Sequence, residues 1–302
     1  MKKVKKILSL LIMVLFSVFI TSCGTSSNFS NEEDISAKVD SNSDLVIHYI
    51  DVGQGDSELI QVDGKNILID AGDNKDDAYY YLKKLGVTTL DYIIATHPHE
   101  DHIGGMDKVI DEMNVGTFYA PKITTNTKTF ENMVNSLKKK NLQMKAPKVG
   151  EEINVGKAKL TFLAPNGDNY KELNDYSIVV KVTYGSNSFL FMGDAEELSE
   201  SEILKNGLDV STDVLKVGHH GSNSSTSNNF LKKVSPTYAI ISVGKDNKYG
   251  HPTDSTLKKL KSKKVFRTDL NGTVRAYSDG KKVYVYSDKK TKEDTKSKKT
   301  KN

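Results

Sequence analysis

Three histidines and two acidic residues fall within the six positions 97 to 102, in the stretch "ATHPHEDHIGG". His97 and His99 alternate on one side of an extended segment, and Asp101 and His102 follow where the chain turns. Four ligating side chains can therefore converge from one loop. Imidazole and carboxylate ligands together suit zinc, manganese or iron, whereas calcium prefers oxygen ligands only. The stretch predicts a metal site rather than a solvated polar loop.

Other candidate ligands follow apolar runs elsewhere in the chain. Asp194 ends "FLFMGD", and His219 and His220 end "VLKVGHH". Of the seven histidines, six lie in such loops, at positions 97, 99, 102, 219, 220 and 251. The seventh, His48, lies inside the run "LVIHYI", where we expect an ordinary strand histidine near the domain surface.

The elements that must position these residues read as an α/β pattern. Short β-rich runs alternate with segments whose apolar residues recur at helical spacing, around positions 78–85, 106–113 and 130–137. The carboxyl ends of strands are where α/β folds place their sites. Strands are expected to end at the polar residues Asp70, His97, Asp194, His219 and Ser242. We therefore expect one domain over residues 44–287.

The first 22 residues have a basic start, "MKKVKK", and an apolar segment shorter than the roughly 20 residues that span a membrane. They predict an export signal. The following "ITSC" resembles a bacterial lipobox, with Cys23 as the lipidated residue; a plain secretory signal and an uncleaved anchor are the alternatives. Residues 23–43 are polar and predict a flexible tether. The domain is thus expected on the extracellular face of the cytoplasmic membrane, anchored by lipid.

Cys23 is the only cysteine, which excludes disulfides and cysteine-ligated zinc. Without the four lysines of the first 22 residues, the chain has 39 basic and 39 acidic residues. The Lys-rich tail, residues 288–302, lacks apolar residues and predicts disorder; it is either a solvated terminus or a polybasic contact. Residues 23–287 carry a formal charge of −4, so the domain lacks the basic footprint of a strong DNA binder.

In order along the chain, several blocks resemble one family. They are "DVGQGD" at 51–56, "IDAG" at 69–72, "THPHEDHIGG" at 96–105, "NDYS" at 174–177, "GD" at 193–194, "LKVGHHGS" at 215–222, "SVGKDNKYGHP" at 242–252 and "RTDLNGTV" at 267–274. The set resembles the metallo-β-lactamase superfamily, and within it the extracellular metallohydrolase domain of ComEC-type competence proteins. The resemblance implies an αββα four-layer sandwich. The membrane channel of full ComEC proteins has no counterpart here.

The resemblance also implies a site for two divalent metal ions. His97 and His99 would hold the first ion, Asp101 and His102 the second, and Asp194 would bridge them. His219 or His220 would complete the second site; we favour His219 as the ligand, with His220 contacting substrate or orienting a ligand. Asp70 would not bind a metal itself but would orient the ligands by hydrogen bonding to them.

One departure from the superfamily pattern concerns the first metal. Many members have a histidine ligand between the clustered histidines and the bridging aspartate, but residues 103–193 contain none. The "NDYS" block falls here, so Asn174 or Asp175 is expected to take its place. An oxygen ligand shifts the preference slightly from zinc toward manganese.

Two metals activate water for displacement at phosphorus or carbonyl carbon, so hydrolysis is the expected reaction. Asp101 and Asp194 would take part as catalytic ligands. One loop carries donors that could hold phosphate oxygens or protonate a leaving group: Lys245, Lys248, Tyr249 and His251. The other residues expected on the substrate side are His220 and Ser222 in a second loop and Asp51, Gln54 and Asp56 in "DVGQGD".

The leading hypothesis is an extracytoplasmic metal-dependent phosphodiesterase, a nuclease acting on DNA. The support for DNA is the family resemblance. A phosphodiesterase for teichoic acid or phosphocholine esters is the second reading, and β-lactam hydrolysis is a weaker third because the middle histidine is missing. From another class, the chain could be a noncatalytic DNA-binding lipoprotein.

Overall fold

The computed structural model describes residues 45–73 and 75–289. The expected export signal, Cys23, the tether and positions 290–302 of the tail lie outside the described residues. Asp288 and Lys289, the first two residues of the Lys-rich tail, are described, and their backbone N–H groups donate to the carbonyls of Thr273 and Asn271. Within the described ranges, no helix is long and apolar enough to cross a membrane.

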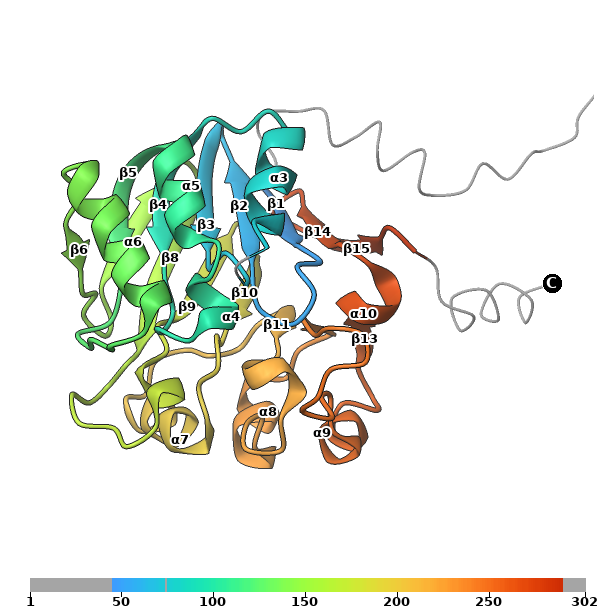
Figure 1. Cartoon of the computed structure of the whole chain (residues 1–302). Helices are drawn as coiled ribbons and strands as arrows, with labels where there is room; N and C mark the ends of the chain where they lie inside the picture. Colours follow the sequence, from blue (N-terminus) through green and yellow to red (C-terminus); the bar gives the residue numbers. More distant parts are fainter. Residues whose placement is uncertain (1–44, 74, 290–302) are drawn as a thin grey trace, which may run out of the picture. The chain divides into compact units, whose positions relative to one another are not determined.

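Two β-sheets form the middle of the domain (Figure 1). The first sheet has eight strands, in the order β15-β14-β1-β2-β3-β4-β5-β6. Their bounds are β1 Leu45–Tyr49, β2 Glu58–Val62, β3 Lys65–Ile69, β4 Thr89–Ile94, β5 Asn114–Tyr119, β6 Met144–Lys145, β14 Val274–Ser278 and β15 Val283–Ser287. Strands β3 to β6 run parallel, and the other neighbours pair antiparallel.

The second sheet has seven strands, in the order β13-β12-β11-β10-β9-β8-β7. Their bounds are β7 Glu152–Val155, β8 Ala158–Ala164, β9 Val179–Tyr184, β10 Asn187–Phe191, β11 Val214–Lys216, β12 Tyr238–Ile241 and β13 Lys264–Arg267. Strands β10 to β13 run parallel and the remainder antiparallel. Each sheet thus has one parallel half, whose strands all end on the same side.

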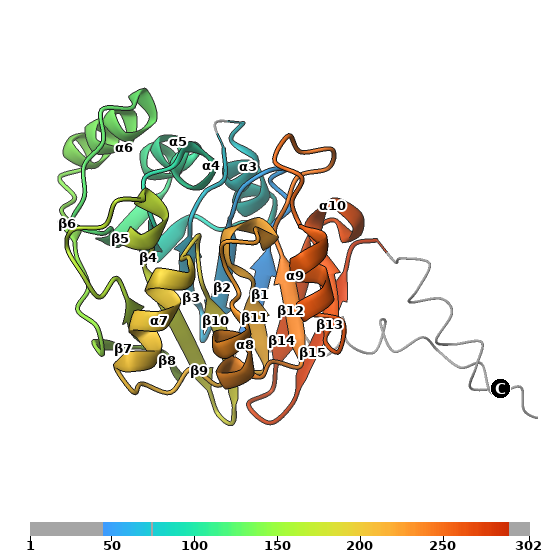
Figure 2. The ribbon, with the colours of Figure 1, turned by 90° about the horizontal axis from the view of Figure 1, so that it is seen from below.

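Helices cover the outer face of both sheets (Figures 1 and 2). On the first sheet lie α3 Asp77–Lys84, α5 Met106–Glu112 and α6 Lys128–Lys139, and on the second α7 Glu197–Lys205, α8 Asn228–Val234 and α9 Asp254–Lys259. The shorter helices are α4 Glu100–Ile103, α10 Thr268–Asn271 and the 3-10 turns η1 Leu173–Tyr176 and η2 Gly218–Gly221. The three helices expected from apolar spacing match α3, α5 and α6.

Three apolar layers explain this arrangement. Strand residues alternate between faces, so Ile60 of β2 packs between the sheets while Leu59 packs under the helices. On the second sheet, Phe189 faces the inner layer and Leu190 the helices. The described domain is therefore the expected αββα four-layer sandwich.

Candidate metal centre

The clustered histidines lie where the chain passes from the end of β4 into α4. His99 precedes the short helix α4 with extended backbone angles, and Asp101 and His102 lie within α4. The longer helix α5 follows at Met106, with Gly105 as its N-cap. The loop at 50–57 approaches α4 closely, because the Asp56 N–H donates to the Asp101 carbonyl at 3.1 Å. Gly55 permits this approach: its φ is +137°, and a Cβ there would lie 2.2 Å from the Asp101 carbonyl oxygen.

Four groups of side chains in the described residues converge as metal ligands do; two of them include Asp56, and the other two form the candidate centre. The first contains His97, His99 and Asp194, and the second contains Asp101, His102 and His220; within each group the ligand atoms lie within 4.8 Å of one another. His97 Nε2 is 2.9 Å from His99 Nδ1. In the second group, His220 Nε2 is 3.2 Å from Asp101 Oδ2.

Asp194 lies between the two groups. Its Oδ2 is 3.8 Å from His97 Nε2, and its Oδ1 is 3.2 Å from His102 Nε2 and 3.5 Å from His220 Nε2. The turn after β10 holds it there, since the Asp194 N–H donates to Ser177 Oγ. One carboxylate oxygen therefore faces each group, as a bridging ligand requires.

Asp70 lies behind the histidines and orients two of them. His102 Nδ1 donates to Asp70 Oδ2 at 2.7 Å, which leaves Nε2 facing the centre. The Thr96 hydroxyl also donates to Asp70 Oδ2, at 2.6 Å, so its oxygen can accept from His97 Nδ1 at 3.2 Å. Buried carboxylates in this position commonly fix the tautomer of metal-binding histidines.

The site concentrates negative potential. Burial lowers the pKa of His220, but the Asp194 and Asp56 carboxylates outweigh it and raise that pKa to about 10. Likewise, burial opposes the charged form of His102, yet Asp194 and Asp70 hold its pKa well above the usual value. The carboxylates thus favour the protonated, positively charged form of these histidines. A bound cation would supply the same positive charge.

His219 occupies a different position from His220. Both residues have left-handed backbone angles, with φ of 48° and 52°, and the resulting turn directs the neighbouring rings to different partners. His219 Nδ1 lies 3.1 Å from Glu196 Oε1 and 3.1 Å from Ser224 Oγ, and its Nε2 is 3.8 Å from Asp194. The geometry groups His220 with Asp101 and His102, whereas the sequence-based preference was for His219.

Asn174 and Asp175, the two substitutes expected for the missing histidine, have different surroundings. Asp175 Oδ1 accepts the backbone N–H groups of Glu196 and Ser199 and so caps the start of α7. Asn174 Nδ2 donates to Glu196 Oε1 and lies 3.4 Å from the His219 ring nitrogens, and its Oδ1 is buried with no hydrogen-bond partner among the described residues. Of the two, Asn174 has a buried side-chain oxygen without a partner, whereas an oxygen of Asp175 is used at the start of α7.

A cavity of about 300 Å³ opens over the centre. It is lined by Gln54, His99, Glu100, Asp101, Asp194, His219, His220, Tyr249 and His251. A second cavity of about 420 Å³, lined partly by Lys248, shares Gln54, Glu100, Asp101 and Tyr249 with it. The ligands are thus reachable from solvent on their substrate side.

The other expected substrate-side residues are not all brought together. Gln54 fixes the adjoining loop by accepting the Gly244 N–H, and Ser222 hydrogen-bonds Ser224 beside His219. Lys245 is exposed outside the lining of the cavity, and Asp51 is exposed, with Oδ1 accepting the Gly53 N–H.

Sequence reasoning missed Thr96, Ser177, Glu196, Ser224 and Lys216, which hold ligands or their neighbours in place. Most gave no signal, because their partners are distant in sequence. Lys216 is different: a lysine in the otherwise apolar run "VLKVG" must either reach solvent or pair inside the protein.

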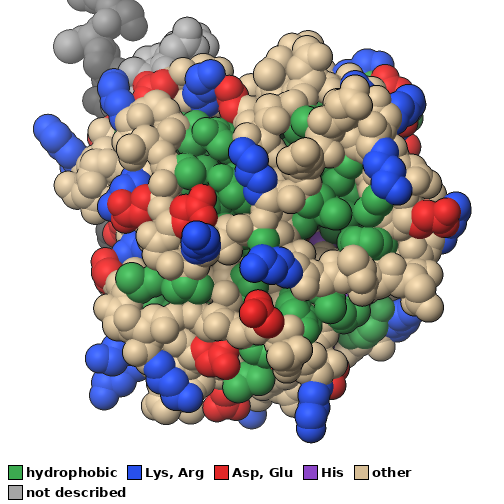
Figure 3. Space-filling view, turned by 90° about the vertical axis from the view of Figure 1, so that its left-hand side faces the viewer, with side chains coloured by type: hydrophobic (Ala, Val, Ile, Leu, Met, Phe, Trp, Pro, Cys, Tyr) green, Lys and Arg blue, Asp and Glu red, His purple; other side chains and the backbone are tan. Residues whose placement is uncertain are grey.

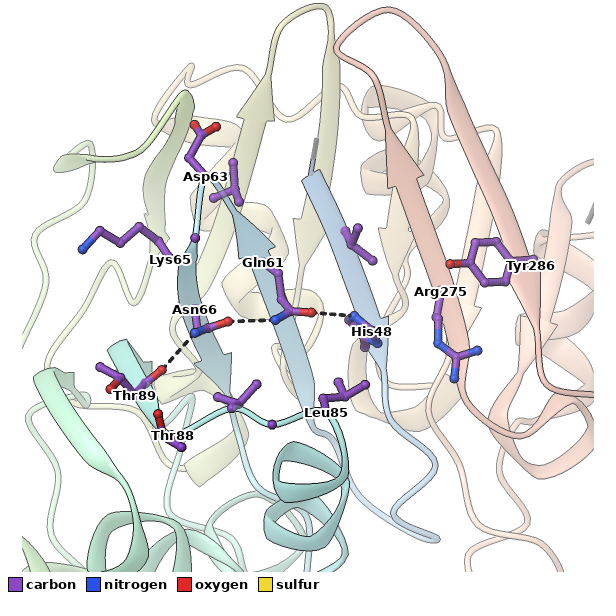
Figure 4. Close-up of a pocket in the computed structure, with 15 residues that line it drawn as sticks. His48, Gln61, Asp63, Lys65, Asn66, Leu85, Thr88, Thr89, Arg275 and Tyr286 are labelled. Atoms are coloured by element: carbon purple, nitrogen blue, oxygen red, sulfur yellow. Dashed lines mark hydrogen bonds between the residues drawn. The ribbon is translucent and has the colours of Figure 1, made fainter. Parts of the chain in front are cut away.

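His48 lies apart from this centre, as expected. On the outer face of the first sheet, its Nε2 is 3.2 Å from Gln61 Oε1, and Gln61 in turn donates to Asn66 (Figure 4). Its Nδ1 lies 2.9 Å from the Tyr81 hydroxyl. The side chain is 5% exposed, so it is more buried than the predicted surface position.

The donors present fit divalent metal ions. His102 Nε2, His220 Nε2 and Asp194 Oδ1 are buried and have no hydrogen-bond partner within the described part of the chain, although they converge on one point. Orphaned buried atoms of this kind are costly unless something binds them. Imidazole and carboxylate together suit zinc, manganese or iron.

The fold and the site define a metal-dependent hydrolase of the metallo-β-lactamase type. The model of the metallo-beta-lactamase superfamily matches residues 50–245, and the chain belongs to that superfamily. ComE operon protein 3 of Bacillus subtilis (strain 168) is 30% identical over 251 residues, which cover 76% of this chain and 32% of that protein. Recombination protein 2 of Haemophilus influenzae is 32% identical over 235 residues, covering 75% and 28%. The resemblance to competence proteins is confirmed, and the chain spans about a third of the length of these relatives.

Solved structures agree on the fold. The metallo-beta-lactamase fold protein YhfI from Bacillus subtilis aligns with a TM-score of 0.52 at 13% identity, covering 80% of this chain and 100% of that one. CmlA, a diiron beta-hydroxylase from Streptomyces venezuelae, aligns with a TM-score of 0.53 at 15% identity, covering 78% and 54%. At these identities the likeness shows the fold alone.

Proposed function

We propose that this chain is a phosphodiesterase that hydrolyses DNA with two divalent metal ions. The observation that carries the proposal is the position of Asp194, whose two oxygens face two separate ligand groups under an open cavity. His97, His99 and Asn174 would hold one ion, and Asp101, His102 and His220 the other. Two divalent ions held there would supply Lewis-acid chemistry: they would lower the pKa of a water molecule and offset negative charge on a phosphate.

The protein's own residues supply positioning around the substrate. Tyr249, His251 and His219 line the cavity, and each side chain carries a group that could donate a hydrogen bond. His219 is held by Glu196 and Ser224, so its ring is fixed relative to Asp194. Fixed donors at a phosphate contribute by orientation and by stabilising charge in the transition state.

DNA is supported by the relatives' names. One matching protein is described as a recombination protein, another as a competence protein of Neisseria gonorrhoeae, 29% identical over 231 residues. Recombination acts on DNA, so a nuclease domain fits such a name. The proposed location, a lipid anchor on the extracellular face of the membrane, rests on the lipobox-like sequence at Cys23.

A phosphodiester of the cell-wall polymer is the second candidate, because the charge of the domain does not favour DNA. Residues 23–287 carry a formal charge of −4, while DNA binding depends on cations that displace counterions. On the face shown in Figure 3, basic and acidic side chains are interspersed and form no continuous basic stripe.

The deciding experiment is hydrolysis by the full chain, purified in detergent, with manganese or zinc added. Single-stranded DNA, double-stranded DNA and bis(p-nitrophenyl) phosphate serve as substrates, and Asp194→Ala is the control. DNA cleavage that disappears in the variant supports the nuclease. Turnover of the small diester alone favours the wall polymer, and bound metal without turnover of any diester indicates a noncatalytic binding protein.

A further inference from the structure

Lys216 lies buried between the two sheets, directly behind the metal centre. It is the last residue of β11 and has no exposed surface. Its Nζ donates to Asp56 Oδ2 at 2.6 Å and to the Val217 carbonyl at 3.2 Å. Taking an ammonium and a carboxylate out of water is costly, so a fully buried pair is weak evidence for stability and calls for another role.

The other oxygen of Asp56 faces a candidate ligand. Asp56 Oδ1 lies 3.2 Å from His220 Nδ1, which is also 3.0 Å from the Ser242 carbonyl oxygen. Because both neighbours are acceptors, Nδ1 is the nitrogen that holds a proton, and Nε2 is the one that would give up its proton to bind a cation. Nε2 points toward Asp101 and Asp194, the other members of the centre.

The position of Lys216 holds Asp56 in this orientation. Lys216 Nζ is 2.6 Å from Asp56 Oδ2, and both side chains are almost completely buried. With one oxygen held by the ammonium group, the other oxygen of Asp56 stays directed at His220.

We propose that Lys216 is a positioning residue of the metal centre, which acts through Asp56 to orient His220 as a ligand. The inference rests on the proposed metal centre and is independent of the substrate. The two histidines of the second group are then held by different means. Asp70 behind His102 is fixed by neutral donors from Thr96, whereas Asp56 behind His220 is fixed by a buried cation.

Metal titration of the full chain tests the proposal. Calorimetric titration with manganese or zinc is compared for wild type, Lys216→Met and the double variant Lys216→Met/Asp56→Asn. The double variant leaves no unpaired buried charge and decides the matter if the single variant does not fold. Loss of a support behind a metal-binding histidine typically weakens metal affinity roughly 10- to 100-fold, and we expect this loss for one of the two metal equivalents, the one held by the group of His220.

Lys181→Met is the matched control. Lys181 is also a buried, ion-paired lysine of the second sheet, but its partner Asp209 is exposed, and neither residue belongs to the ligand groups or to the lining of the cavity over them. It should keep wild-type metal affinity. A folded Lys216 variant that binds both equivalents within about threefold of wild type would overturn the proposal, since an effect of 10- to 100-fold is expected.

A second readout separates positioning from simple stability. The measurement is NMR of the exchange of the His220 Nδ1 proton with solvent, in zinc-loaded protein labelled with 15N-histidine. The signal is assigned by its absence in His220→Gln. Exchange should be slow in wild type and Lys181→Met and fast in both Lys216 variants. If the proton stays protected there, the Ser242 carbonyl alone orients the ring and the inference is wrong. Failure of the wild type to cleave DNA counts only against the proposed function.

Discussion

Asp194 Oδ1 lies 3.2 Å from His102 Nε2, and the second oxygen of the same carboxylate faces His97 instead. One side chain thus joins the two ligand groups. Its position depends on the turn after β10, where the backbone of Asp194 is tied to Ser177.

Asp194→Ala should remove the shared ligand and therefore reduce both metal content and turnover. We expect fewer than two metal equivalents and at least a roughly 100-fold loss of diester hydrolysis, because weaker changes behind a ligand already cost 10- to 100-fold. Elemental analysis and a bis(p-nitrophenyl) phosphate assay measure these. Asp254→Ala, an exposed position on α9, is the control. Full metal content in Asp194→Ala would exclude the bridging role.

His219→Gln and His220→Gln should separate the two neighbouring histidines. His220 groups with Asp101 and His102, so its loss should cost one metal equivalent. His219 is held by Glu196 and Ser224, so its loss should lower turnover while metal content stays at the wild-type value. Metal content measured on the two variants side by side decides. The opposite pattern would restore the sequence-based choice of His219.

Asn174→Ala and Asp175→Ala should likewise have different effects. Asn174 offers a buried oxygen, and its removal should weaken metal binding at the group of His97 and His99. Asp175 caps backbone N–H groups at the start of α7, so its removal should cost about 1 kcal/mol of unfolding free energy and leave metal content unchanged. Urea unfolding and metal titration are the measurements. A lost metal in Asp175→Ala would reassign the ligand.

His48 should make the protein less stable in mild acid. Burial, followed by the charge of Arg275, lowers the pKa of His48 from 6.5 to about 4. Between these values the unfolded chain binds a proton that the folded chain does not, so stability falls as the pH falls through that window. We expect a contribution of about 2 kcal/mol between pH 7 and pH 4.5, given 1.36 kcal/mol per pKa unit.

Urea unfolding at both pH values, with chelator present, compares wild type with His48→Gln. The variant should lose less stability between pH 7 and pH 4.5 than wild type does. Equal losses would show that His48 is protonated in the folded protein in this range.

Cys23→Ala should release the protein from the membrane if a lipid on this residue is the anchor. A single cysteine makes the test unambiguous, because no other thiol can take the lipid. Fractionation of cells and medium, followed by immunoblotting, measures the distribution. Ser26→Ala, three residues further on, is the control. Membrane retention equal to wild type would rule out lipidation as the anchor.

Much of this protein was determined by local sequence. The alternation of apolar residues within strands and their helical spacing elsewhere define the layers, because each element must bury one face. The segment 97–102 carries four candidate ligands within six consecutive residues, so these side chains lie close together without any long-range contact. The α/β class and the metal site followed from these patterns, whereas the superfamily and its four-layer fold were implied by the resemblance of the motif blocks.

Only the tertiary structure could decide which distant residues complete the centre. His219 and His220 are adjacent in sequence, and their different roles depend on two left-handed backbone conformations that no local pattern indicates. Asp175 accepts backbone N–H groups at the start of α7, whereas its neighbour Asn174 does not. Lys216 and Asp56 are 160 residues apart and meet only because the two sheets pack face to face, which places the inward side of β11 against the loop after β1. Sequence determines which side chains point inward, but contacts between sheets depend on how the layers are stacked.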